Sequence, residues 1–103
     1  MKVALTDAAL ADLDAIVDFI AQDSPVRAIS FGGELLDAAY AIGELPLGYT
    51  LVTRYSHLGV RRKVYRAYVI LYWIIDGRID VLHILNAAQD YEAILAGEIG
   101  GPE

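Results

Sequence analysis

The sequence contains no cysteine, so disulfide bonds and metal sites with thiolate ligands are both excluded. Long apolar runs are also absent, because the run over residues 68–75 is far shorter than the roughly 18 residues that a membrane-spanning helix needs. At the N-terminus the sequence becomes acidic from Asp7, before the apolar core of a signal peptide could form. We therefore expect no membrane contact and a cytoplasmic location.

Recognisable enzyme motifs are missing as well. The chain has no HExxH, GxSxG or P-loop sequence, which removes the signatures of common zinc hydrolases, serine hydrolases and nucleotide-binding proteins. His57 has no partner at metal-ligand spacing, and His83 stands alone within an apolar strand, where a hydrogen-bonded core histidine is the commoner outcome. We expect no cofactor and no metal.

Internal repeats and linkers are absent, and 103 residues suit one small domain. We assign it to residues 1–97, followed by a flexible tail over residues 98–103, where glycine and proline are frequent.

Positive charge is scarce and concentrated. Eight Lys and Arg residues face 14 Asp and Glu residues, which gives a net charge of −6. Six of the eight bases lie within residues 45–78, which contain a single acid, whereas residues 1–44 and 79–103 are strongly acidic. The overall acidity opposes a broad nucleic-acid surface, since affinity for the phosphate backbone comes from Lys and Arg. A local basic patch can still hold an anionic partner.

The centre of the chain predicts three antiparallel strands, over residues 59–64, 68–75 and 79–86, with Asp76-Gly77 as a tight hairpin turn. Alternation places one set of middle-strand residues on each face of the sheet, and both sets are apolar. One set is Tyr68, Ile70, Tyr72 and Ile74, and the other is Val69, Leu71, Trp73 and Ile75. Both faces therefore need cover, by this chain or by a partner.

Two amphipathic helices precede the sheet. Apolar residues recur at helical spacing over residues 8–21, after the N-cap candidate Thr6, and again over residues 25–43, after Ser24 and Pro25. Gly32-Gly33 indicates close helix packing, or alternatively a hinge. Residues 2–5 add a short edge strand and residues 90–96 a short last helix. The order predicts an α+β fold whose helical hairpin covers one face of the sheet and leaves the other uncovered.

This order of segments resembles the RelE/ParE superfamily of bacterial type II toxins, and its ParE branch in particular. The resemblance is carried by ALADLDAIVDFIAQDSPVRA in the hairpin, ELPLGY after it, GVRRKVYRAYVILYWI in the sheet and IDVLHILNAAQDYEAIL at the end. It implies a toxin that forms a hetero-oligomer with a ParD-like antitoxin laid along the uncovered sheet face. The expected contact residues are Val69, Leu71, Trp73, Ile75, Leu82 and Ile84, or else the alternate set of the middle strand, because the sequence alone does not fix which face the hairpin covers. The alternative is that the hairpin and the C-terminal segment bury both faces.

RelE-like members are ribosome-dependent ribonucleases, and cleavage through an RNA 2′-OH needs a base, an acid and cations at the phosphate. Where the family places an arginine this chain has Val69, and where it places His-Arg-Arg the chain has Asn86, Ala87 and Ala88. Tyr91 matches a tyrosine of the RelE pattern but is interpreted as a packing residue. The sequence therefore predicts no catalytic residues and no enzyme, with a RelE-like mRNA interferase as the alternative.

Resemblance to ParE implies that DNA gyrase is the target and that protein contact inhibits it. Arg61 and Arg62 match the basic pair of the family, and Arg54 completes the expected target-binding set. On a strand Arg61 and Lys63 share one face and Arg62 points to the other, so a charged, solvated edge strand is an equal alternative. A third hypothesis is a non-toxic remnant that only binds antitoxin.

Overall fold

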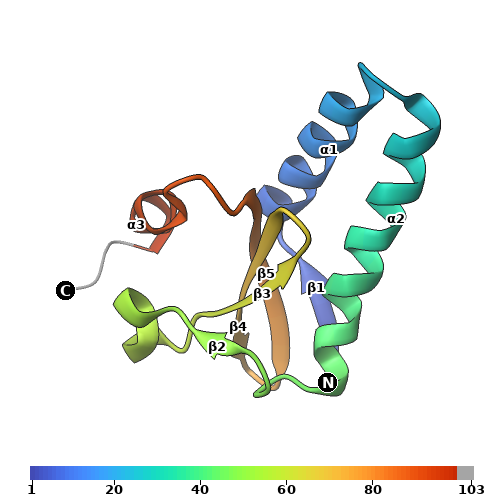
Figure 1. Ribbon diagram of the computed structural model, residues 1–103. Coiled ribbons are helices and arrows are strands. Elements are labelled where there is room, and N and C mark those ends of the chain that lie inside the picture. The colour runs from blue at the N-terminus through green and yellow to red at the C-terminus, as the bar shows by residue number, and fades with distance from the viewer. Residues whose placement is uncertain (100–103) are drawn as a thin grey trace.

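The computed structural model describes residues 1–99 and has the α+β architecture that the sequence predicts (Figure 1). The elements follow in the order β1 (Val3–Leu5), α1 (Asp7–Ala21), α2 (Pro25–Tyr40), η1 (Ala41–Glu44), β2 (Thr50–Leu51), η2 (Thr53–Leu58), β3 (Arg61–Tyr65), β4 (Tyr68–Ile75), β5 (Arg78–Asn86) and α3 (Tyr91–Ile99), where η marks a 3₁₀ helix.

The described strands form one sheet in the order β1-β5-β4-β3-β2. The β1 strand pairs in parallel with β5, and the other pairs are antiparallel. Positive φ angles of 51° at Asp76 and 74° at Gly77 close the predicted β4–β5 hairpin, because two successive left-handed residues match the twist of the paired strands.

Predicted capping residues fix the helical hairpin. The Thr6 hydroxyl accepts a hydrogen bond from the Ala9 amide at 3.2 Å, and the Ser24 hydroxyl accepts one from the Arg27 amide at 3.1 Å. At Gly32 an added Cβ would lie 2.9 Å from Val17 Cγ2, so close packing of the two helices explains this glycine. The second helix ends at Tyr40, and η1 continues the chain to Glu44.

The hairpin covers one face of the sheet. Figure 1 shows α1 and α2 together on that side and α3 with η2 on the other. Tyr72, Ile70 and Ile79 are fully buried beneath the hairpin, together with Leu35 and Ile42. These residues form the main hydrophobic core, as alternation along the middle strand predicts.

The expectation that the opposite face is uncovered is wrong over its centre. Val69 is 1% exposed and Leu71 is 0% exposed, because Leu95 of α3 and Tyr55 of η2 pack against the same cluster. The Tyr55 hydroxyl donates to the Glu92 carbonyl at 3.0 Å, which joins η2 to α3. The cover thus comes from two short segments, and one of them has no periodic pattern in the sequence.

A β-bulge in β5 changes which residues of this strand face each side of the sheet, so the prediction that Leu82 and Ile84 share a face is wrong. Leu71 pairs with His83 whereas Tyr72 pairs with Val81, so Leu82 is an extra residue. Strict alternation therefore fails at Leu82. Ile84, expected on the face of Leu82, is instead 1% exposed in the core beneath the hairpin.

The last helix also differs from its predicted end. It extends to Ile99 rather than to residue 96, so residues 98 and 99 of the expected tail belong to α3. Residues 100–103 lie outside the described part of the chain.

Candidate functional site

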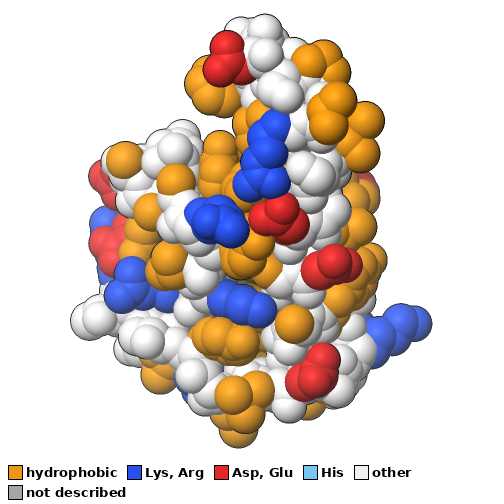
Figure 2. Space-filling view, turned by 45° about the vertical axis from the view of Figure 1, so that its right-hand side comes forward, with side chains coloured by type: hydrophobic (Ala, Val, Ile, Leu, Met, Phe, Trp, Pro, Cys, Tyr) orange, Lys and Arg blue, Asp and Glu red, His pale blue; other side chains and the backbone are white. Residues whose placement is uncertain are grey.

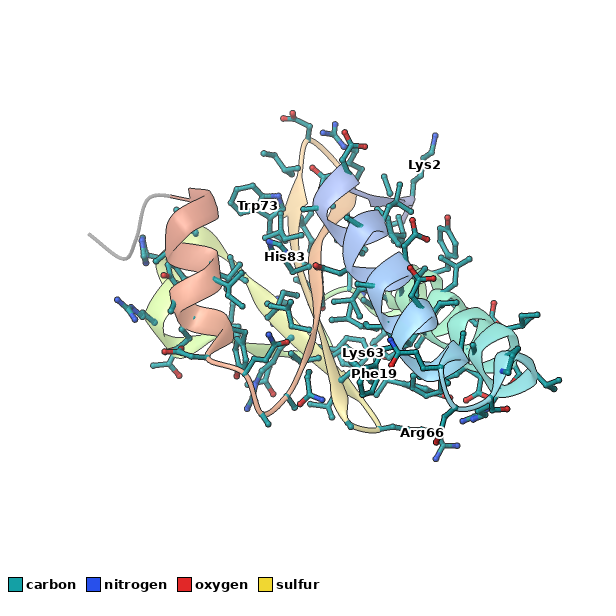
Figure 3. The ribbon with its side chains drawn as sticks, turned by 90° about the horizontal axis from the view of Figure 1, so that it is seen from above. Lys2, Phe19, Lys63, Arg66, Trp73 and His83 are labelled. Carbon is teal, nitrogen blue, oxygen red and sulfur yellow. The ribbon has the colours of Figure 1, made fainter. Side chains whose placement is uncertain are left out.

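An apolar rim remains where α3 does not reach the sheet. It consists of Trp73 and Leu82, both partly buried against the α3-side cluster, and of Ile75, which is 37% exposed at the end of β4. Within the described residues, the buried Trp73 Nε1 has no hydrogen-bond acceptor. Figure 3 shows Trp73 on the α3 side of the sheet, and Lys63 and Phe19 on the side of the hairpin.

The six residues expected to meet an antitoxin are therefore separated. Trp73, Ile75 and Leu82 form the accessible rim, whereas Val69 and Leu71 lie under α3. Ile84 belongs to the hairpin-side core. Of the expected contact residues, only those of the rim are accessible to a partner.

The basic strand β3 divides its side chains between the two faces, as alternation predicts. Arg61 Nη1 donates to the Tyr49 carbonyl at 2.7 Å, and Lys63 Nζ donates to the Ala38 carbonyl at 2.7 Å. Lys63 thus places its charge in the last turn of α2, where the helix dipole favours a cation. Lys63 therefore joins α2 to the sheet, and Arg61 joins the loop after the hairpin to the sheet, so both residues have a structural role.

Arg62 lies on the opposite face, beside α3. Its Nη1 donates to the Tyr91 hydroxyl at 3.3 Å. The pair lines a cleft of about 210 Å³ together with Glu92 and residues 50–53. Tyr91 therefore has a cationic neighbour, which the sequence did not reveal because 29 positions separate it from Arg62. Arg54 is exposed, with its guanidinium carbon 5.9 Å from the centroid of the Tyr55 ring.

His83 is a hydrogen-bonded core residue, as expected. Its Nδ1 lies 2.6 Å from Asp12 Oδ2, and the same oxygen accepts the Ile84 amide at 3.0 Å. The Asp12 carboxylate of α1 thus contacts both the His83 ring and the Ile84 amide of β5. Both residues follow Val81, the last residue of β5 that pairs with β1. Since buried amides need an acceptor, Asp12 fixes how α1 sits on this edge.

Two further polar contacts join the hairpin side to the sheet. Glu34 accepts from Arg27 Nη1 at 2.8 Å and from the Tyr65 hydroxyl at 2.7 Å, and these hydrogen bonds lower the pKa of its carboxyl group. Tyr72 donates to the Pro46 carbonyl at 2.6 Å. Burial raises the pKa of Tyr72 to about 12, since the ionised phenolate would lose its hydration.

Other kinds of site find no support in the described residues. Among the side chains that the structure describes, no group of three or more His, Cys, Asp or Glu residues could hold a metal ion. In the same part of the chain no helix is long and apolar enough to cross a membrane.

Comparison with known proteins identifies relatives of this fold. Residues 3–91 match the family described as the ParE toxin of the type II toxin–antitoxin system parDE. A curated relative, Toxin RelE2 of Caulobacter vibrioides, is 38% identical over 88 residues, which cover 85% of this chain and 97% of that protein. A solved structure described as the chromosomal ParDE TA system from P. aeruginosa shares the fold, with a TM-score of 0.70 and 22% identity over 84% of this chain and 95% of that chain. The chain therefore belongs to the ParE toxin family of type II toxin–antitoxin systems.

Proposed function

We propose that this toxin inhibits DNA gyrase by protein contact in the cytoplasm, without catalysis of its own, and that a ParD-like antitoxin neutralises it. The description of the matching family names the parDE system, which favours a ParD-like partner. A ParE-type toxin in turn favours gyrase as the target.

The proposal that the toxin does not act as an enzyme is supported by the basic side chains, which lie on both faces of the sheet and do not converge on one site. Arg61 and Lys63 are engaged by backbone carbonyls on the hairpin side, and within the described cleft Arg62 is the cation beside Tyr91. Cleavage of RNA needs several groups that converge on one phosphate, with charge stabilisation as the largest contribution. A lone arginine suits recognition of an acidic protein surface better.

We assign contact with gyrase to Arg62 and Arg54, since Arg61 is already bonded to Tyr49. The test is a gyrase supercoiling assay with the purified chain and with an Arg54→Ala/Arg62→Ala double variant. Arg78→Ala is the matched control, because Arg78 pairs with Asp80 at the β4–β5 turn. We expect wild type and control to inhibit gyrase and the double variant to be inactive. Equal inhibition by all three proteins would refute this assignment.

The antitoxin is proposed to cover the rim formed by Trp73, Ile75 and Leu82. An apolar side chain from the partner would bury this surface, and a carbonyl or carboxylate could reach Trp73 Nε1 if the indole shifts. Ile75→Glu should weaken the complex with the adjacently encoded antitoxin, because it places a charge in an apolar interface. Leu47→Glu is the control, at a loop side chain that is 69% exposed. Unchanged binding by a folded Ile75→Glu variant would exclude the rim.

The alternative function, a RelE-like mRNA interferase, is favoured by one observation. Arg62, Tyr91 and Glu92 line one cleft, and together they offer a cation, a hydroxyl and a carboxylate. The relative named RelE2 is consistent with this alternative. Purified ribosomes with a defined message provide the test: message cleavage that Tyr91→Phe abolishes would establish the ribonuclease and overturn the gyrase proposal. A chain that affects neither gyrase nor message cleavage but still binds antitoxin would support the third hypothesis, a non-toxic remnant that only binds antitoxin.

A further inference from the structure

The outer face of the helical hairpin exposes apolar side chains that the fold does not use. On α2, Val26 is 81% exposed, Ile29 is 77% exposed and Tyr40 is 51% exposed. Leu10 of α1 is 45% exposed. A surface helix normally buries its apolar stripe and presents polar residues to water, and α2 already buries a separate stripe that includes Phe31 and Leu35. Figure 2 shows hydrophobic side chains gathered along the outer edge of this region.

These α2 residues are regularly spaced. Val26, Ile29, Gly33, Leu36 and Tyr40 follow one another at intervals of three, four, three and four residues, which is the spacing of the seam along which two helices pack. Gly33 lies at the middle of the stripe, and a Cβ there would meet nothing within 4 Å. The backbone of α2 is therefore open at this point, and a side chain of a second helix could approach it closely.

The α1 helix extends the surface on one side. The two helices are antiparallel and Val17 lies against Gly32, so Leu10, two turns earlier in α1, lies beside the C-terminal half of α2. The resulting surface, called here the hairpin stripe, comprises Leu10, Val26, Ile29, Gly33, Leu36 and Tyr40.

Acidic side chains flank the hairpin stripe. Asp14 and Asp18 are exposed on α1, and Asp37 is exposed on α2 beside Leu36. Among the described side chains none of the three forms an ion pair, whereas Arg27 of α2 is already paired with Glu34 at 2.8 Å. The stripe thus combines an apolar centre with unneutralised negative charge on both sides.

We propose that the hairpin stripe docks an amphipathic helix of a partner protein, with apolar residues along its centre and Lys or Arg on both flanks. Charge complementarity selects this occupant. A second copy of the chain would bring the Asp14, Asp18 and Asp37 carboxylates of both copies together, and an anionic lipid surface would be repelled by the same groups. The hairpin lies on the opposite side of the sheet from α3 (Figure 1). The rim and Arg62 lie on the α3 side, so this partner can bind together with one at α3.

A designed peptide tests the proposal on the full chain. The probe is an 18-residue helical peptide with leucine at the seam positions and lysine at both flanks. A peptide with the same leucines and glutamate at the flanks is the charge-reversed control. A third peptide has the lysine composition in scrambled order and forms no stripe. Binding is measured by fluorescence anisotropy, and NMR chemical shifts locate the site. We expect the lysine peptide to bind with shifts on α1 and α2, and the other two to bind at least tenfold more weakly.

Variants locate the interaction and separate its two components. Val26→Lys/Ile29→Lys should weaken the lysine peptide at least tenfold, and both sites are exposed enough for the fold to persist. Val64→Lys, at a 58% exposed side chain of β3, should bind like wild type. Asp14→Lys/Asp18→Lys should shift the preference toward the glutamate peptide. Equal binding to wild type and Val26→Lys/Ile29→Lys, or shifts confined to other elements, would overturn the proposal. A dimer seen by sedimentation in wild type and lost in that variant would overturn it in favour of a second copy.

Discussion

Replacement of Leu95 by alanine tests directly whether α3 covers the sheet. Leu95 is 0% exposed and packs in the cluster with Val69 and Leu71. Truncation of a fully buried leucine costs about 2–5 kcal/mol, from the lost burial and from the cavity that remains. Because α3 is short and can relax toward the cavity, we expect a loss of about 3 kcal/mol, which lowers the Tm of a domain of this size by more than about 10 °C.

The assay is urea unfolding followed by tryptophan fluorescence. Trp73 is the single tryptophan of the chain and packs against the same cluster, so its emission reports the α3 side of the sheet. Leu47→Ala is the control with identical chemistry, at a side chain that is 69% exposed, and it should change stability by less than about 0.5 kcal/mol. If the two variants had equal stability, α3 would not pack on the sheet, and Val69 and Leu71 would be open to a partner after all.

Three further predictions concern the polar contacts. Burial raises the pKa of Tyr72 to about 12 from an ordinary value of 10.0. The unfolded chain therefore releases this proton at lower pH than the folded chain, and the free energy of unfolding should fall as pH rises from 10 toward 12. Urea unfolding of Tyr72→Phe across this range should show a smaller fall. The pKa of Glu34 is lowered from 4.5, so its contribution is present above pH 4.5 and lost as pH falls below it, and Glu34→Gln should flatten acid unfolding in that window. Asp12→Ala should cost about 1–3 kcal/mol in urea unfolding, because the Ile84 amide loses its acceptor; an unchanged midpoint would show that water replaces the carboxylate.

Local sequence signals predicted most of the fold. Thr6 and Ser24 occupy the cap positions expected of them, and Asp76-Gly77 forms the expected turn. The β4 alternation correctly separated Ile70 and Tyr72 from Val69 and Leu71. Each of these features depends on residues that are adjacent or nearly adjacent in the chain, where propensity and periodicity act directly.

The parts that sequence reasoning missed depend on long-range packing. The bulge at Leu82 reverses the faces of the following residues of β5, and no local signal marks it. The cover over Val69 depends on Tyr55 in η2, a 3₁₀ segment with neither helical nor strand periodicity. Likewise, the contact of Arg62 with Tyr91 arises because β3 and α3 meet in space. The sequence correctly predicted that the sheet face opposite the hairpin is apolar. Most of this face is covered by α3 and η2 of the same chain and not by a partner.

Induced expression of the chain alone in bacteria, with the DNA damage response and bulk translation followed in parallel, distinguishes inhibition of gyrase from cleavage of messages. Wild type and Tyr91→Phe are compared, since the Tyr91 hydroxyl lies beside Arg62 in the cleft on the α3 side. If gyrase is the target, we expect a damage response and filamentous cells with initially intact translation, and the same phenotype for Tyr91→Phe. Immediate arrest of translation with cleaved messages, relieved by Tyr91→Phe, would contradict this expectation.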